Sequence, residues 1–297
     1  MPRIVSFLPA GTEIVHALGA GEQLVGRSHE CDYPASAAGL PVVSRPALDL
    51  EGLAPEAVDR AVAARLRAGQ SLYEVDEALL DALAPDLILT QDLCQVCAPS
   101  GNELSRALQQ LRSRPQVVWL SPRNLAEIEA NISAVGQAIG AEAARAAEAL
   151  IAANRARIER VRAQVAGAPL RRVAFLEWID PLFAAGHWVP EMIALAGGAD
   201  PLGRPGEDSL RVEWPEVLAG RPELVIVAPC GFHLARSAEL ARELPAVPGA
   251  RVSAVDANAF FARPGPRAAL GIELLAHLFH PDRVAWERGE RPWQEIR

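Results

Sequence analysis

The 297-residue chain contains no lysine, so that all 29 of its lysine-plus-arginine residues are arginines. A chain without lysine cannot form a Schiff base through a side-chain amine, and it cannot contain a phosphate-binding loop that ends in Gly-Lys. The arginines form no dense cluster, and the formal net charge is -8. Binding to nucleic acid requires concentrated positive charge, so we exclude nucleic acid as the main partner.

Long apolar segments are missing too. No stretch approaches the ~20 apolar residues that a membrane span requires, so we expect no membrane span. The chain begins almost at once with a predicted strand, Ile4 to Phe7, and shows no charged leader, apolar core or cleavage site before it. On this basis we expect a cytoplasmic protein, with a periplasmic location as the alternative if the sequence is that of a processed form.

Recognisable catalytic signatures are also missing. The sequence has no His-Glu-x-x-His, no nucleophile elbow and no glycine-rich nucleotide loop. Its four cysteines are too few for a disulfide framework in a chain of this length. We therefore predict no catalytic residue and no enzymatic activity.

What the sequence does contain is a repeated α/β pattern. Pro85-Asp86-Leu87-Ile88-Leu89 is echoed by Pro222-Glu223-Leu224-Val225-Ile226, and each run is typical of a buried parallel strand. Between the two halves, 141–165 is rich in Ala, Arg and Glu and predicts one helix of about 37 Å. We expect two Rossmann-like α/β lobes with mainly parallel sheets, at 1–123 and 169–297. Linker helices at 124–168, including the long interdomain helix, would join them.

Polar, sulfur-containing and aromatic side chains follow the ends of the predicted strands. Open α/β sheets bind their ligands beyond the carboxyl ends of the strands, so we expect these side chains to face a cleft between the two lobes. The candidate ligand-binding residues are His29, Cys31, Tyr33, Gln91, Asp92, Phe183, Trp188, Phe232, Phe260 and Phe261.

All four cysteines lie at predicted strand exits, and two of them form a Cys-x-x-Cys pair. Thiolate and imidazole are good ligands for zinc or cobalt, so a metal site is one interpretation. Structural packing of the thiols is another, because cysteines are often buried without a ligand, and a thiol redox role is a third. The candidate metal-binding residues are Cys94, Cys97, Cys230 and His233.

A metal-dependent enzyme remains the alternative of a different class. A Cys/His site with an open coordination position could activate water, and Glu13, Glu30 or Asp92 could then act as the base. The lack of any catalytic motif argues against this alternative.

Several short motifs, taken in order, make the chain resemble a known family. They are Ser6-Phe7-Leu8-Pro9-Ala10-Gly11-Thr12-Glu13, Asp32-Tyr33-Pro34, Pro85-Asp86-Leu87-Ile88, Pro181-Leu182-Phe183-Ala184-Ala185-Gly186 and Phe261-Ala262-Arg263-Pro264-Gly265-Pro266-Arg267. With this order and spacing, nearly the whole chain resembles the periplasmic binding proteins of cobalamin and iron-siderophore ABC transporters. The similarity is greatest to the cobalamin-binding branch and to a subgroup without export signals.

The resemblance implies a monomeric protein that holds cobalamin or a related corrinoid between its lobes, for uptake, storage or transfer. Haem or a siderophore is the alternative ligand. In the family, one glutamate on each lobe is implied to pair with the ABC permease. Glu103 stands at the first of these positions, but Ala262 replaces the second, which puts docking to a permease in doubt.

Overall fold

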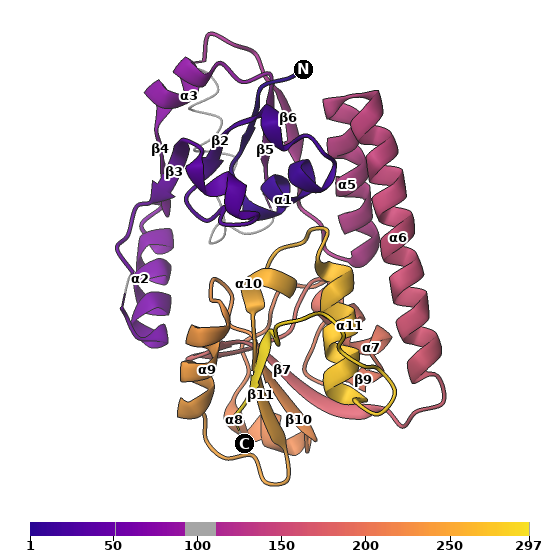
Figure 1. Ribbon diagram of the computed structural model, residues 1–297. Coiled ribbons are helices and arrows are strands. Elements are labelled where there is room, and N and C mark those ends of the chain that lie inside the picture. The colour runs from indigo at the N-terminus through magenta and orange to yellow at the C-terminus, as the bar shows by residue number, and fades with distance from the viewer. Residues whose placement is uncertain (51, 93–110, 297) are drawn as a thin grey trace. The chain divides into compact units, whose positions relative to one another are not determined.

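The computed structural model describes residues 1–50, 52–92 and 111–296. These residues form two compact units, each built around its own sheet (Figure 1). Unit 1 comprises 1–122 and 126–152, and unit 2 comprises 123–125 and the chain from 153 onward. The predicted fold class, two mainly parallel α/β lobes linked by a long helix, is confirmed.

Unit 1 has a six-stranded sheet in the order β4-β3-β2-β1-β5-β6. The strands are β1 (Ile4–Ser6), β2 (Leu24–Ser28), β3 (Val42–Pro46), β4 (Tyr73–Val75), β5 (Leu87–Thr90) and β6 (Gln116–Trp119). All neighbouring strands pair in parallel except β4, which runs antiparallel to β3 at the edge. The apolar runs of β1 and β5 are buried on both faces, as expected of central strands in a parallel sheet.

The helical segments of unit 1 connect these strands. They are α1 (Pro9–Ala17), the 3-10 turns η1 (Gly21–Gln23) and η2 (Ala35–Gly39), α2 (Pro55–Arg67), α3 (Glu77–Leu83) and α5 (Leu125–Ile139). Two predictions from local sequence are wrong. Thr12 is predicted to cap the first helix, but it lies inside α1, which begins at Pro9. Tyr73 is predicted to continue a helix, but it forms the edge strand β4.

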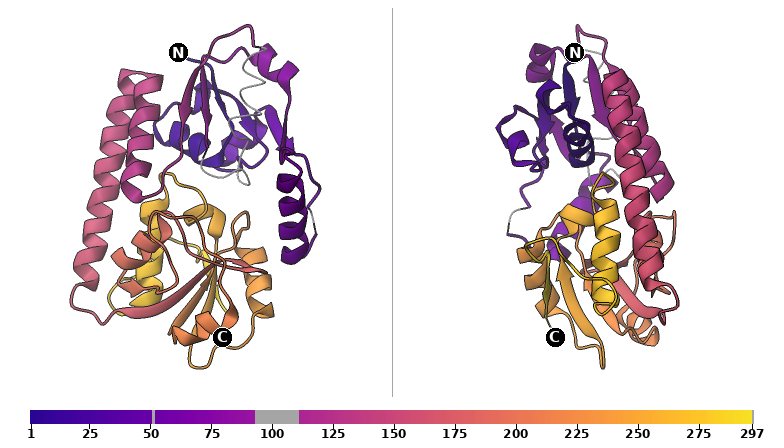
Figure 2. Two further views of the ribbon diagram at one scale, coloured as in Figure 1. Left: turned by 180° about the vertical axis from the view of Figure 1, so that it is seen from behind. Right: turned by 45° about the vertical axis from the view of Figure 1, so that its right-hand side comes forward.

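The long helix α6 (Ala141–Val165) begins directly after Gly140. Its first half runs side by side with α5 within unit 1 (Figure 2). A Cβ at Gly136 of α5 would lie 2.8 Å from the Ala147 Cβ and 2.9 Å from the Ala143 carbonyl oxygen, so glycine allows the two helices to pack closely. By their contacts, α5 and the first half of α6 group with unit 1, and the predicted linker over 124–168 stays a prediction.

The second half of α6 packs in unit 2. Its Arg157 forms a 2.8 Å ion pair with Glu273, which Arg288 also contacts at 3.0 Å. Glu273 lies in α11 and its side chain is only 16% exposed, so the pair joins the two helices in a mostly buried setting. Residues 153–165 are therefore tied to this unit.

The sheet of unit 2 has the order β12-β11-β10-β7-β8, with β9 paired to β7. The strands are β7 (Arg171–Ile179), β8 (Leu182–Ala184), β9 (Gly198–Ala199), β10 (Leu224–Val227), β11 (Arg251–Val255) and β12 (Trp293–Glu295). The helices are α7 (Val189–Leu195), α8 (Trp214–Ala219), α9 (Leu234–Glu243), α10 (Ala257–Phe260) and α11 (Ala268–Phe279). Strands β7, β10 and β11 are parallel, whereas β8 and β12 are antiparallel additions.

Strand β7 is longer than the sequence predicted. The apolar run from Val173 to Leu176 predicts a strand that ends at Leu176, followed by an exit loop from Glu177 to Trp188. Pairing with β8 instead extends β7 to Ile179 and turns part of the expected loop into a hairpin. Among the residues that the structure describes, no helix is both long and apolar enough to cross a bilayer.

Candidate functional site

The carboxyl ends of β7, β10 and β11 lie at one edge of the unit 2 sheet, because these strands are parallel and in register. At this edge the rings of Trp178 and Phe232 stack, with centroids 5.7 Å apart and planes 19° from parallel. The Trp178 indole N–H is held by the Asp180 carbonyl at 2.9 Å. Both rings are only partly buried, so the pair presents a flat apolar surface.

A histidine and a carboxylate lie next to each other at the same edge. His233 Nδ1 lies 3.1 Å from both carboxylate oxygens of Asp256. Asp256 follows β11 and caps α10, because its Oδ1 also accepts a 2.8 Å hydrogen bond from the Ala259 N–H in the first turn of that helix. Cys230, three residues before His233, has an exposed thiol. Imidazole and thiol thus follow a single strand, β10.

Two of the predicted aromatic ligand residues belong to the core. Phe261 is 2% exposed and packs edge-on against Phe175 at 5.2 Å. Trp188 is 6% exposed, and its indole N–H donates a 2.9 Å hydrogen bond to the Phe261 carbonyl. Phe183 in β8 and Phe260 at the end of α10 are partly buried. A part in ligand binding stays a prediction for all four.

The sequence analysis missed a cluster of polar residues at this end of β7. The Glu177 carboxylate accepts hydrogen bonds from the Ser209 hydroxyl and, at 3.1 Å, from the Gly186 N–H. Desolvation, with a smaller contribution from the charge of Asp200, raises the pKa of Glu177 to about 7. A glutamate at the end of an otherwise apolar strand was the signal that could have identified it.

A contact between a histidine and a carboxylate joins the same two segments of chain. His187 Nε2 lies 3.1 Å from the Asp208 carboxylate, which Arg123 contacts at 3.4 Å. Burial lowers the pKa of His187 despite the nearby Asp208 charge. Residues 186–187 and 208–209 are thus held together by two adjacent sets of contacts. One is centred on the Glu177 carboxylate, and the other is the contact between His187 and Asp208.

In unit 1, the loop after β2 carries three of the predicted residues. Cys31 is fully buried, and its sulfur accepts a 3.0 Å hydrogen bond from the Thr12 hydroxyl, so local packing would have to change before the thiol could meet a ligand. His29 lies near the Tyr73 ring, with centroids 5.9 Å apart. Tyr33 is 49% exposed. Of these three predicted residues, Tyr33 is therefore the exposed one.

After β5, Gln91 is 5% exposed, whereas Asp92 is exposed and its N–H donates a 2.8 Å hydrogen bond to the Ser121 hydroxyl. Cys94, Cys97 and Glu103 lie outside the described residues. The predicted Cys-x-x-Cys metal site therefore stays a prediction, and docking to a permease through Glu103 stays in doubt.

The described residues do not show the predicted metal site. Outside the 93–110 gap and the two single masked positions, no group of three or more His, Cys, Asp or Glu side chains is arranged to hold a metal ion. Cys230 and His233 alone do not fit a zinc site, which takes at least three protein ligands. We derive no chemistry through a resident metal.

Comparisons with known proteins agree with the two-lobed architecture. The family model described as "Periplasmic binding protein" matches residues 4–262. The vitamin B12-binding protein of Vibrio cholerae serotype O1 is 28% identical over 282 residues, which cover 91% of this chain and 86% of that protein. The crystal structure of the periplasmic vitamin B12 binding protein of Vibrio cholerae has a TM-score of 0.65 at 24% identity, covering 94% of this chain and 97% of that one.

A haem binder has a similar fold. The crystal structure of a periplasmic heme binding protein from Pseudomonas aeruginosa has a TM-score of 0.68 at 19% identity, covering 99% of this chain and 98% of that chain. These matches overturn one expectation. The cytoplasmic location that we expected is wrong, because the matched family and these relatives are periplasmic binding proteins.

Proposed function

Since the chain belongs to the periplasmic binding protein family, we propose that it binds cobalamin or a related corrinoid, for uptake, storage or transfer. Members of this family bind small molecules and deliver them to ABC transporter permeases. The observation that carries the corrinoid assignment is the 28% identity to a vitamin B12-binding protein over 91% of the chain.

The stacked pair at the edge of the unit 2 sheet supports this proposal. A corrin ring is a broad, partly apolar plate, and flat aromatic surfaces with a few polar groups at the rim are well suited to hold such a plate. Trp178 and Phe232 supply such a surface at the strand exits. We propose that the ligand contacts this pair. Tyr33, which is 49% exposed in unit 1, is a separate candidate.

We further propose that His233 or Cys230 contacts the metal at the centre of the ligand. Imidazole and thiolate both coordinate cobalt. A carboxylate at one ring nitrogen orients the imidazole and makes it a better ligand, and Asp256 lies at His233 Nδ1. Asp256 would then be a positioning residue, acting through the imidazole.

Haem is the second candidate ligand, and a specific observation favours it. Haem is also a flat metal macrocycle, and a solved structure with the same fold is named for binding it. The same stacked rings and histidine would suit either molecule. The visible spectrum of the bound ligand separates the two.

The test is to titrate the purified chain with cyanocobalamin and, separately, with haemin, following the heat of binding and the melting temperature. A ligand that binds only the folded state must stabilise it, by about 2.7 kcal/mol at a free concentration of a hundred times Kd. We expect one-to-one binding of cyanocobalamin with quenching of tryptophan emission. No heat and no thermal shift with cyanocobalamin would refute the corrinoid assignment, and binding of haemin alone would replace it.

Variants then locate the site. Trp178→Ala and Phe232→Ala each remove one of two stacked rings and should weaken binding by about tenfold or more. Leu218→Ala removes an apolar side chain, 39% exposed on α8, that follows no strand exit, and serves as the control. Wild-type affinity in both ring variants, with unchanged melting temperatures, would place the ligand elsewhere.

A further inference from the structure

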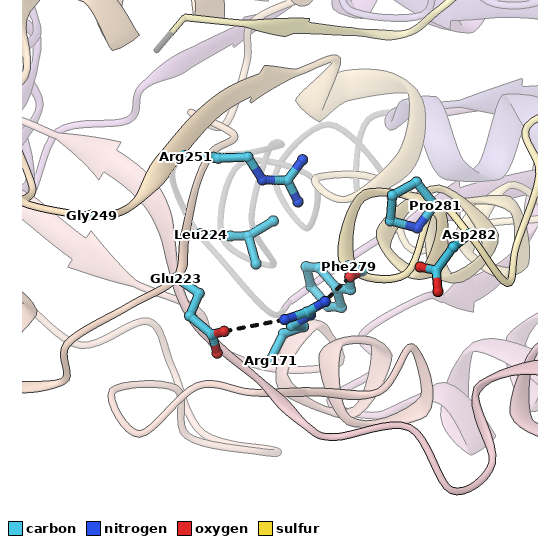
Figure 3. A pocket seen from close by; sticks show the side chains of 8 residues that line it. All are labelled: Arg171, Glu223, Leu224, Gly249, Arg251, Phe279, Pro281 and Asp282. Atoms are coloured by element: carbon cyan, nitrogen blue, oxygen red, sulfur yellow. Dashed lines mark hydrogen bonds and ion pairs between the residues drawn. The ribbon is translucent and has the colours of Figure 1, made fainter.

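The other end of the unit 2 sheet carries a cavity. A cavity of about 390 Å³ opens at the amino ends of β7, β10 and β11 (Figure 3). Arg171, Glu223 and Arg251 stand at the start of these strands, whereas Trp178 and Phe232 follow the opposite ends. This cavity is therefore separate from the proposed corrinoid site.

One of the two arginines in this cavity is already neutralised. Arg171 Nη1 lies 3.3 Å from the Glu223 carboxylate (Figure 3), and the Arg172 N–H donates a 3.0 Å hydrogen bond to the other Glu223 oxygen. These contacts lower the pKa of Glu223 and keep it ionised. Arg171 and Glu223 thus contribute little net charge to the cavity.

Arg251 is different. Its Nη2 donates a 2.8 Å hydrogen bond to the Leu278 carbonyl, and within the three described ranges it forms no ion pair with a carboxylate. Figure 3 shows its guanidinium group directed into the cavity. A guanidinium group has five N–H donors in a fixed fork that matches a carboxylate or phosphate. Most of the N–H donors of the Arg251 guanidinium are therefore left for another partner.

A smaller cavity of about 210 Å³ shares Arg251 and extends along β11 and β12. Its lining includes Arg291, whose guanidinium lies 5.8 Å from the Trp293 ring centroid, and the imidazole of His277. Arg291 also makes no ion pair within the part of the chain that the structure describes. Two arginines that form no ion pair among the described residues thus line adjoining cavities, together with the carboxylates Asp282 and Glu295.

Capping of a helix accounts for only part of this arrangement. Arg251 and Arg171 contact the Leu278 and Phe279 carbonyls, which end α11. Cations commonly stabilise the carboxyl end of a helix in this way. One N–H of Arg251 suffices for that role, and Arg291 takes no part in it.

We propose that these adjoining cavities form a binding site for a small anion, in which the Arg251 fork holds a carboxylate or phosphate group. Because Asp282 and Glu295 also line these cavities, the anion would be held by direct hydrogen bonds from the guanidinium group and not by an excess of positive charge. Arg291 and the face of Trp293 would contact the remainder of an organic anion. This site is independent of the corrinoid ligand.

The experiment uses the full chain and two probes, citrate and inorganic phosphate, each titrated at constant ionic strength and followed by calorimetry. We expect saturable binding of at least one probe with Kd below about 1 mM. Binding of citrate alone identifies a carboxylate site, and binding of phosphate alone a phosphate site. If neither probe binds, the proposal is overturned.

Two arginine variants test the residue assignment. Arg251→Gln should weaken binding at least about tenfold, because it removes both the charge and the fork. Arg242→Gln removes the same charge from an exposed position of α9 and should bind like the wild type. If Arg251→Gln does not fold, Arg251→Lys keeps the charge and loses the fork, and it should still bind more weakly. Equal affinity in every folded Arg251 variant and the wild type would overturn the proposal.

Discussion

The backbone N–H of Gly186 donates a 3.1 Å hydrogen bond to the carboxylate of Glu177, at the point where β7 leaves the sheet. A Cβ at Gly186 would lie 2.5 Å from the Ser209 backbone nitrogen, so the hairpin packs directly on the segment that carries Ser209. Ser209 binds the other oxygen of the same carboxylate. One titratable group therefore holds two segments beside the proposed corrinoid site.

The raised pKa of Glu177 predicts a pH dependence of stability. Because the pKa rises from 4.5 in the unfolded chain to about 7 in the folded one, the folded state binds the proton more tightly. This contribution is fully present below pH 4.5 and is lost as the pH rises through 7. It amounts to at most about 3 kcal/mol. Glu177→Gln should flatten the fall of melting temperature with pH in this window.

The control for Glu177→Gln is Glu287→Gln, which changes an exposed carboxylate of the same unit. Its melting temperature should follow the wild-type pH profile. Calorimetric melting of the three proteins across the window decides the matter. If the melting temperature of Glu177→Gln falls with pH as steeply as that of the wild type, the pKa of the Glu177 carboxyl does not lie in this pH window.

The close approach of α5 and α6 predicts that Gly136→Ala destabilises unit 1. The added methyl would lie 2.8 Å from the Ala147 Cβ and 2.9 Å from a backbone oxygen, so a helix must shift. Overpacking of this kind costs about 1–3 kcal/mol of unfolding free energy. Gly39→Ala is the matched control, since its Cβ meets nothing within 4 Å. Urea denaturation that leaves Gly136→Ala as stable as the wild type would contradict this packing.

The mostly buried ion pair between α6 and α11 predicts a large effect of Glu273→Gln. Arg157 and Arg288 would both lose their charged partner, and Arg157 is only 22% exposed. We expect a loss of about 3 kcal/mol, as is typical when one partner of a buried pair is removed. Glu239→Gln breaks an exposed pair with Arg236 and should cost about 1 kcal/mol or less. Equal losses in the two variants, measured by denaturant unfolding, would contradict this difference in burial.

The two described cysteines should differ in reactivity. Cys230 is exposed and should react with iodoacetamide in the folded protein, whereas Cys31 is fully buried and should react only after unfolding. Mass spectrometry of the labelled peptides shows whether Cys31 or Cys230 has reacted, and it separates both from Cys94 and Cys97. If Cys230 contacts the corrinoid as proposed, cyanocobalamin should protect it. Equal labelling with and without ligand would remove Cys230 from the site.

The sequence by itself determined the central elements of both units. The apolar run in Pro222-Glu223-Leu224-Val225-Ile226 predicts β10 (Leu224–Val227), because such a run between turn residues is typical of a strand buried on both faces. The run from Ala141 to Val165 likewise predicts its helix, since it contains neither proline nor glycine. The chain's membership of its family also followed from short motifs in order.

Only the tertiary structure decided the edges of the sheets and the state of the side chains at the strand exits. The three-residue strands β4, β8 and β12 exist because a neighbouring strand offers an antiparallel partner, and no local pattern encodes that partner. Phe232 and Phe261 are the same residue type at two strand exits, yet one ring stays partly exposed and the other is buried. Their burial, and the raised pKa of Glu177, depend on groups distant in sequence, because desolvation is set by everything that surrounds a side chain.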